Sequence, residues 1–151
     1  MTNKVIVEPQ SSPHLKVLVV EDDLCLQTVL TRVLQHIEPH LEITWVTTAD
    51  QAWAELRTKG RMNARPYDIF FADVLTPGIR NGIDFWKTCK LRYPDIPFVL
   101  SSGMPVDNFL RMCGNQSPFP IFLHKPFSIN DCENVIAGAI NQAHCKSHKP
   151  A

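Results

Sequence analysis

Acidic side chains follow two apolar stretches of the sequence, each at a point where a buried strand would end. Residues 17–20 lead directly into Glu21 and Asp22, and residues 69–72 lead into Asp73 before a Pro-Gly turn. A charge inside a buried strand needs a partner, whereas the C-terminal end of the strand can carry one. In open α/β sheets, that edge is also where ligands bind. The pattern therefore predicts that the three carboxylates meet in one acidic pocket.

The predicted pocket has the composition of a site for a hard metal cation. Crowded carboxylates repel one another unless a cation neutralises them. Oxygen ligands suit Mg²⁺ or Mn²⁺, and Mg²⁺ usually keeps several waters beside one or two carboxylates. The alternative is that the acids only cap the following helix, and for Asp23 alone we prefer that role. Asp73 precedes a turn rather than a helix start, which favours a metal ligand at that position.

Two more strand ends bring a hydroxyl and an ammonium group to the same edge. Residues 98–100 lead into Ser101 and Ser102, either of which could supply the hydroxyl, and residues 121–124 lead into Lys125. Singly, such residues are most often solvated. Together with a metal they suit a phosphoryl group, because the cations neutralise its oxygens and the hydroxyl donates a hydrogen bond. Asp73 could then act as a nucleophile that forms an aspartyl phosphate.

Five strands and five helices must position these side chains. Apolar runs predict strands at 16–20, 42–47, 67–72, 97–101 and 121–123, and helical periodicity predicts helices between 23 and Pro39, at 49–59, 82–92 and 106–113, and from Ser128 to about Cys145. The β-α alternation favours a parallel sheet covered by helices on both faces, with right-handed crossovers. The strand at 42–47 alternates polar and apolar residues, which is typical of a sheet edge.

The bulk composition bounds the domain and its partners. The 151 residues fit one domain, expected at 15–145 between tails at 1–14 and 146–151. The net charge is zero, with 15 basic and 15 acidic residues, so nucleic-acid binding has no electrostatic support. No apolar run is long enough to span a membrane and no signal peptide is visible. The five cysteines are odd in number and lack C-x-x-C spacing, which favours free thiols in a cytoplasmic protein over a disulfide framework or a zinc site.

In this arrangement, the chain resembles the receiver domain of bacterial two-component response regulators, the family of the chemotaxis response regulator. The resemblance covers about residues 15–145 and rests on five elements in order: Glu21-Asp22, Asp73, Ser102-Gly103, Phe122, and Lys125-Pro126-Phe127. Each element alone is weak, but all of them at suitable strand ends form a specific signal. The fold implied is flavodoxin-like, a doubly wound (βα)5 sheet with strand order 2-1-3-4-5.

The resemblance also implies the chemistry and the partners. Asp73 would accept a phosphoryl group from the phosphohistidine of a sensor histidine kinase or a histidine phosphotransfer protein. Asp22 and Asp73 would bind Mg²⁺ directly, with the backbone carbonyl of Leu75 as a third ligand and Glu21 acting through a metal-bound water. The domain would signal to a downstream protein that the sequence does not identify.

Three further positions are assigned by the same resemblance. Lys125 would pair with the phosphoryl group, and its bond to Pro126 would be cis. Ser102 would bond a phosphoryl oxygen and is preferred to Ser101 because Gly103 follows it. Phe122 would rotate inward as the aromatic switch.

The sequence departs from the family pattern on two segments. Thr76 stands where a methionine is usual, and the stretch up to Gly82 carries one extra residue, which predicts a differently shaped loop. The segment from Met104 to Pro120 is rich in proline, so the fourth helix is expected to be short and irregular.

Four functions stay open from the sequence. The leading one is a stand-alone receiver with no enzymatic activity beyond its own phosphorylation and dephosphorylation. A second is a receiver fragment of a regulator with an enzymatic or DNA-binding output domain. A Mg²⁺-dependent phosphatase would need a second acid where Leu75 stands. A flavin or dinucleotide binder would need a glycine-rich loop, and no G-x-G-x-x-G follows the first strand.

Overall fold

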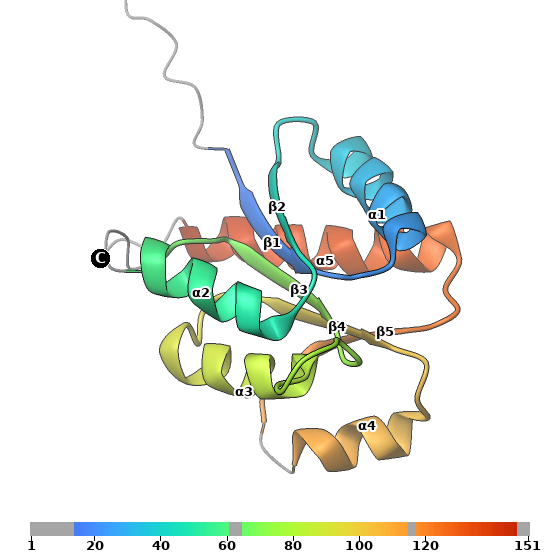
Figure 1. Ribbon diagram of the computed structural model, residues 1–151. Coiled ribbons are helices and arrows are strands. Elements are labelled where there is room, and N and C mark those ends of the chain that lie inside the picture. The colour runs from blue at the N-terminus through green and yellow to red at the C-terminus, as the bar shows by residue number, and fades with distance from the viewer. Residues whose placement is uncertain (1–13, 61–64, 115–116, 148–151) are drawn as a thin grey trace, which may run out of the picture.

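A computed structural model describes residues 14–60, 65–114 and 117–147, over which strands and helices alternate (Figure 1). In chain order the elements are β1 (Lys16–Val20), α1 (Leu24–Ile37), β2 (Glu42–Val46), α2 (Ala49–Lys59), β3 (Ile69–Asp73), α3 (Gly82–Arg92), β4 (Phe98–Ser102), α4 (Val106–Cys113), β5 (Ile121–His124) and α5 (Ile129–Ser147). The N-terminal tail expected at 1–14 lies almost wholly outside the described residues. Helix α5 extends two residues into the expected C-terminal tail.

The strands form one parallel sheet in the order β2-β1-β3-β4-β5, which confirms the predicted flavodoxin-like topology. The register pairs Val20 with Ala72 across β1 and β3, and Asp73 with Ser101 across β3 and β4. Because all strands run the same way, their C-terminal ends meet at one edge of the sheet. This edge carries Glu21 and Asp22, which follow β1, and Asp73, which is the last residue of β3.

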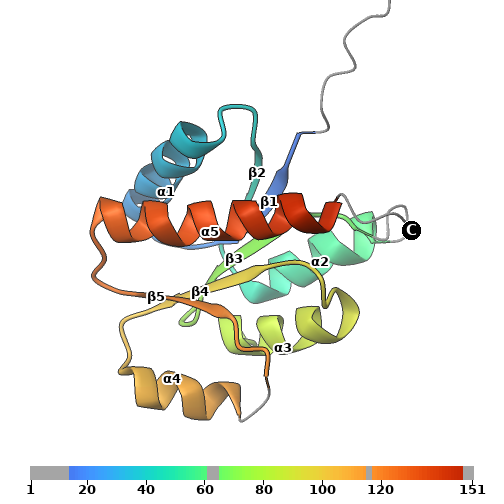
Figure 2. The same ribbon diagram turned by 180° about the vertical axis from the view of Figure 1, so that it is seen from behind.

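Helices cover both faces of the sheet. Helices α1 and α5 lie on one face, and α2, α3 and α4 lie on the other (Figures 1 and 2). Alternate strand residues supply the two cores, as the two-residue period of a strand requires. Leu18, Phe70 and Leu100 belong to the core under α2 and α3, whereas Val19 and Val99 belong to the core under α1 and α5.

The helix starts follow local capping chemistry. Asp23 caps α1, since its Oδ1 accepts the N–H groups of Cys25 at 2.8 Å and Leu26 at 3.3 Å. Asn81 and Asp84 form a capping box at α3. Ser128 and Asp131 exchange equivalent bonds at the start of α5. The capping role predicted for Asp23 is therefore confirmed.

Some predicted boundaries need correction. Strand β3 begins at Ile69 rather than residue 67, because the buried Tyr67 packs into the core before the strand begins. Strand β4 runs one residue later than predicted. Helix α4 is short, as expected, but it is a regular helix that ends at Gly114, whose φ of 71° suits glycine. Over the described ranges, no helix combines the length and apolar character needed to cross a membrane.

Candidate functional site

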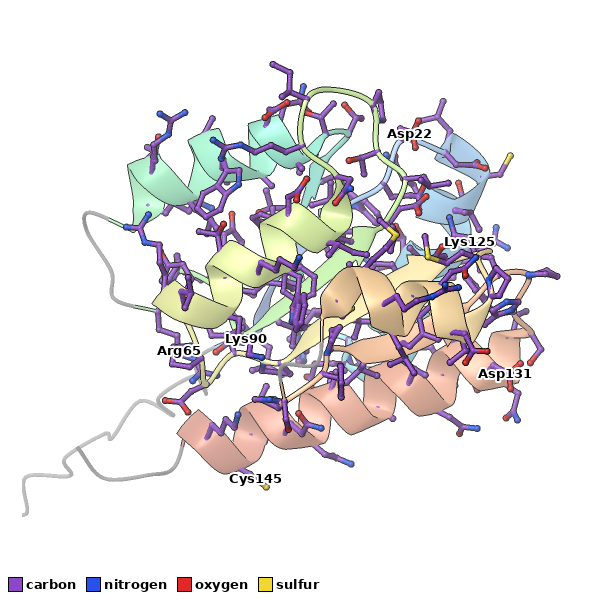
Figure 3. The ribbon with its side chains drawn as sticks, turned by 90° about the horizontal axis from the view of Figure 1, so that it is seen from below. Asp22, Arg65, Lys90, Lys125, Asp131 and Cys145 are labelled. Atoms are coloured by element: carbon purple, nitrogen blue, oxygen red, sulfur yellow. The ribbon has the colours of Figure 1, made fainter. Side chains whose placement is uncertain are left out.

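The structure brings the three predicted carboxylates together at the C-terminal edge of the sheet. Carboxylate oxygens of Glu21, Asp22 and Asp73 all lie within 4.8 Å of one another. Glu21 and Asp73 are buried, whereas Asp22 is exposed. Figure 3 shows Asp22 and Lys125 toward one end of the molecule and Arg65 and Lys90 toward the other. The pocket therefore has one open side, at Asp22.

Main-chain bonds hold the first acidic pair in place. The N–H of Glu21 donates to the carbonyl of Val46 at 3.0 Å and thereby joins the turn to β2. Glu21 Oε1 accepts the N–H of Asp23 at 3.0 Å, and Gln27 Nε2 donates to the Glu21 carbonyl at 2.7 Å. The same short segment thus ends β1, starts α1 and fixes the Glu21 carboxylate. The role of Gln27 was not predicted, because a single polar residue on a helix carries no signal of its partner.

Lys125 bridges the two buried carboxylates. Its Nζ lies 2.8 Å from Asp73 Oδ2 and 3.4 Å from Glu21 Oε2. Asp73 Oδ1 accepts the N–H of Leu75 at 3.1 Å, so both oxygens of Asp73 are engaged. The peptide bond between Lys125 and Pro126 is cis, as predicted. The ammonium therefore lies where it neutralises the nucleophile candidate directly.

The electrostatics of the pocket follow from burial and from these contacts. Burial raises the pKa of Glu21 above its ordinary value, and the charge of Asp73 adds to that effect, although the Asp23 N–H and the Lys125 ammonium oppose it. For Lys125, burial acts to lower the pKa, but the hydrogen bond to Asp73 and the charges of Asp73 and Glu21 together raise it. The ammonium form of Lys125 is thus stabilised, while Glu21 holds its negative charge less readily than an exposed glutamate.

The remaining predicted residues are Ser102 at the end of β4, Phe122 within β5 and Leu75 in the loop after β3. Ser102 is buried, and its Oγ accepts the N–H of Met104 at 3.1 Å. Phe122 is half-buried and stacks on Phe109 of α4 with ring centroids 4.2 Å apart. The Leu75 side chain is 70% exposed. The phosphoryl, switch and carbonyl-ligand roles of these residues stay predictions.

The loop after Asp73 is held against α2 and against the strand itself. The N–H of Gly82 donates to the Val74 carbonyl at 3.0 Å, which closes the loop across its extra residue. Asp50 Oδ2 of α2 accepts the N–H of Ile79 at 3.4 Å, and the Arg80 guanidinium lies 5.9 Å from the centre of the Trp53 ring. These contacts were not predicted, because α2 and the loop come together only in the folded chain.

The donor set fits a hard divalent cation. Three oxygen donors from Glu21, Asp22 and Asp73 lie close together, and the single ammonium of Lys125 compensates only part of their charge. One of the three, Asp22, is open to solvent, as a partly hydrated Mg²⁺ requires. Such an ion would polarise oxygens beside the Asp73 carboxylate, which Lys125 already contacts from another direction.

Comparison with known proteins places this site in a family. The sequence model of the response regulator receiver domain matches residues 17–137. A probable transcriptional regulator, ycf29 of Cyanophora paradoxa, is 26% identical over 132 residues, which are 85% of this chain and 57% of that protein. The chain spans about half the length of the curated relatives it matches.

Solved structures agree on the fold. A signal receiver domain of an HD domain-containing protein from Pseudomonas fluorescens Pf-5 has a TM-score of 0.75 at 16% identity, and the match covers 96% of this chain and all of that one. The phosphorylated cyanobacterial phytochrome response regulator RcpA has a TM-score of 0.70 at 19% identity, with 91% and 99% covered. At this identity the likeness supports the shared fold alone.

Proposed function

Since the chain belongs to the response regulator receiver domain family, we propose that Asp73 is the residue that accepts a phosphoryl group. The donor would be a phosphohistidine on a sensor histidine kinase or on a histidine phosphotransfer protein. The phosphorylated domain would then present a changed face to a downstream protein. Receiver domains are signalling modules, and here we expect no catalytic activity beyond phosphorylation and dephosphorylation of Asp73 itself.

One observation carries the proposal: Lys125 Nζ contacts both Asp73 and Glu21 while Asp22 stays open to solvent. A lysine on one side and a metal on another would neutralise the oxygens of a phosphoryl group as it reaches the carboxylate. The nucleophile is held at the same time, because Leu75 N–H fixes its second oxygen. A site that only binds cations would have no use for a lysine paired with its ligands.

Mg²⁺ is the cofactor that we propose, with Mn²⁺ as a substitute. Asp22 and Asp73 would bind it directly, with the Leu75 carbonyl as a third ligand, and Glu21 would act through a metal-bound water. Lys125 and Ser102 would contact the phosphoryl oxygens. Phe122 would rotate inward on phosphorylation, which would change its contact with Phe109. We propose a cytoplasmic location for this chain.

The output of the whole protein is a separate proposal. Because the chain spans only about half the length of the curated relatives, both a stand-alone receiver and the receiver part of a longer regulator fit the chain. Both relatives are named as transcriptional regulators. The neutral net charge favours protein partners over direct contact of this domain with nucleic acid.

A phosphorylation assay tests the assignment of Asp73. Incubation with acetyl phosphate and Mg²⁺ should add one phosphoryl group to the intact mass, because the small donor supplies the group without a kinase. Asp73→Asn should add none, since an amide is no nucleophile here, whereas the control Asp107→Asn on the exposed face of α4 should still gain the group. Unchanged mass of the unaltered protein would overturn the proposal, and steady release of phosphate from many organic phosphates would favour a phosphatase.

A further inference from the structure

The hydroxyl of Ser101 is buried without a hydrogen-bond partner, directly beside the proposed phosphoacceptor. Ser101 is fully inaccessible to solvent, and its Oγ forms no hydrogen bond with any described residue. Burying an unpaired hydroxyl disfavours the folded state, and such groups are few in native structures. Valine or alanine would fill the same position without that penalty. The serine therefore calls for an explanation in the chemistry of its neighbours.

The strand register identifies these neighbours. Ser101 pairs with Asp73 on β3 and with Leu123 on β5, and paired residues of parallel strands point to the same face. Glu21 follows Val20, which pairs with Ala72, so the next position along β1 and β3 sets Glu21 beside Asp73. Glu21, Asp73 and Ser101 thus form one row across three adjacent strands. The row lies on the α1 and α5 face of the sheet.

Ser101 and Ser102 differ in the face of the sheet to which they point and in the hydrogen bonding of their hydroxyls. Ser102 points to the opposite face from Ser101, and its Oγ already accepts the N–H of Met104. Ser101 lies in the row of the carboxylates, and its hydroxyl has no hydrogen-bond partner among the described residues. Adjacent strands are about 4.8 Å apart, and a serine hydroxyl turns between three staggered positions. The pairing of the two residues therefore allows the Ser101 hydroxyl to approach the Asp73 carboxyl.

In the unphosphorylated protein, both carboxylate oxygens of Asp73 already have other partners. Its Oδ2 is bound by the Lys125 ammonium and its Oδ1 by the Leu75 N–H. Phosphorylation changes the carboxylate. The bond between phosphorus and the donor nitrogen breaks with its electrons left on nitrogen, a bond between phosphorus and one Asp73 oxygen forms, and the other oxygen becomes a neutral carbonyl. Lys125 is then drawn to the charged phosphoryl oxygens.

We propose that Ser101 is a positioning residue whose hydroxyl donates a hydrogen bond to the carbonyl oxygen of phosphorylated Asp73. A neutral hydroxyl suits a neutral carbonyl, whereas the ammonium suits the phosphoryl charges. The unpaired hydroxyl raises the free energy of the unphosphorylated state. This cost disappears when the hydroxyl gains a partner on phosphorylated Asp73. Ser101 thus shifts the balance between the two states toward the phosphorylated one. This inference rests on the proposed function of Asp73.

A matched pair of variants tests the inference. Ser101→Thr keeps the hydroxyl and Ser101→Val replaces it with a methyl group of similar shape. Beryllium fluoride with Mg²⁺, as a stable mimic of the phosphoryl group, should bind the valine variant roughly twofold to tenfold more weakly than the threonine variant, the range expected for one neutral hydrogen bond. Without the mimic, the folding equilibrium constant of the valine variant should exceed that of the threonine variant by about fivefold or more, because the valine variant has no unpaired hydroxyl.

The outcomes separate this inference from the proposed function. If the two variants bind the mimic equally while the unaltered protein binds it, Ser101 has no positioning role and Asp73 is still the acceptor. If the unaltered protein neither binds the mimic nor gains mass with acetyl phosphate, the proposed function itself fails. A valine variant that is less stable than the threonine variant would show that the hydroxyl is satisfied before phosphorylation, which also overturns the inference.

Discussion

Gly82 sets how closely the start of α3 packs against the strand that carries Asp73. A Cβ atom at this position would lie 2.2 Å from the Asp73 carbonyl oxygen and 2.9 Å from its carbonyl carbon. Atoms of the main chain cannot give way as the end of a flexible side chain can. Contact of this closeness explains why a glycine, and no larger residue, fits the first position of α3.

Replacing Gly82 with alanine should therefore destabilise the protein by about 3 kcal/mol or more, in the upper range for overpacked sites. The displaced strand end should also reduce phosphorylation of Asp73 by acetyl phosphate. Urea unfolding measures the first effect and intact mass the second. Gly138→Ala is the matched control, because a Cβ there meets nothing within 4 Å and alanine favours the α5 helix by about 0.5–1 kcal/mol. Equal effects of both substitutions would contradict this account.

The residues of the site differ in how far the sequence discloses them. Asp73 and Lys125 are polar residues at the ends of apolar runs, and this contrast can be recognised in the sequence alone. Ser101 and Gly82 owe their importance to a register and to a close approach, which exist only when two segments meet. Ser101 in particular reads as one of two equivalent serines until the pairing with Asp73 is known.

Among the elements, α2 is joined by a polar network to the segment that precedes β3. The buried Tyr67 hydroxyl donates to Glu55 Oε1 at 2.9 Å and lies 3.0 Å from Lys59 Nζ, which is itself 3.0 Å from Glu55. Hydrogen bonds from Lys59 and Tyr67 lower the pKa of Glu55 from its ordinary value of 4.5. Folding therefore favours the ionised form of Glu55.

The sign of the resulting pH dependence follows from this shift. The contribution of Glu55 to stability is complete above its ordinary pKa and is lost as the pH falls through the lowered pKa. Glu55→Gln should thus reduce the loss of unfolding free energy between about pH 7 and about pH 3, by up to about 1 kcal/mol for a partly exposed pair. Urea unfolding at each pH gives the measurement. Glu42→Gln, at the exposed start of β2, should leave the loss unchanged.

Most of the element order could be predicted because each element has its own local signal. The five apolar runs and the helical periodicity between them specify the alternation, and the β-α order then restricts the sheet to few topologies. The start of β3 was misplaced because Tyr67 is apolar enough to extend the run, although its hydroxyl bonds α2. The regularity of α4 was missed since its flanking prolines lie outside the helix itself.

On the scale of the whole molecule, the acidic pocket joins parts of the chain that are distant in sequence. Glu21 and Asp22 follow β1, Asp73 ends β3, and Lys125 follows β5. An unfolded chain cannot hold these groups within a few ångström, so it has no comparable site for a metal ion. Binding of the proposed Mg²⁺ would thus be linked to folding of the entire domain.

Mg²⁺ should therefore raise the unfolding free energy of the whole domain. At a free concentration about 100 times the dissociation constant, the gain should be about 2.7 kcal/mol. Asp22→Asn should reduce the gain at the same concentration because one ligand is lost, whereas Asp95→Asn, on the exposed loop before β4, should not. Thermal or urea unfolding with and without the ion measures both. A gain that persists undiminished in Asp22→Asn would place the ion elsewhere.

The bridge that Lys125 makes between Glu21 and Asp73 also leaves part of the negative charge of the pocket unbalanced. Three carboxylates and one ammonium give the pocket a formal charge of two negative units. An approaching phosphoryl group is itself negative and would be repelled, whereas one divalent cation brings the count to zero. Under the proposed function of Asp73, phosphoryl transfer would therefore depend on a divalent ion bound beforehand. Removal of divalent ions would then prevent phosphorylation of Asp73 even when the phosphohistidine donor is present.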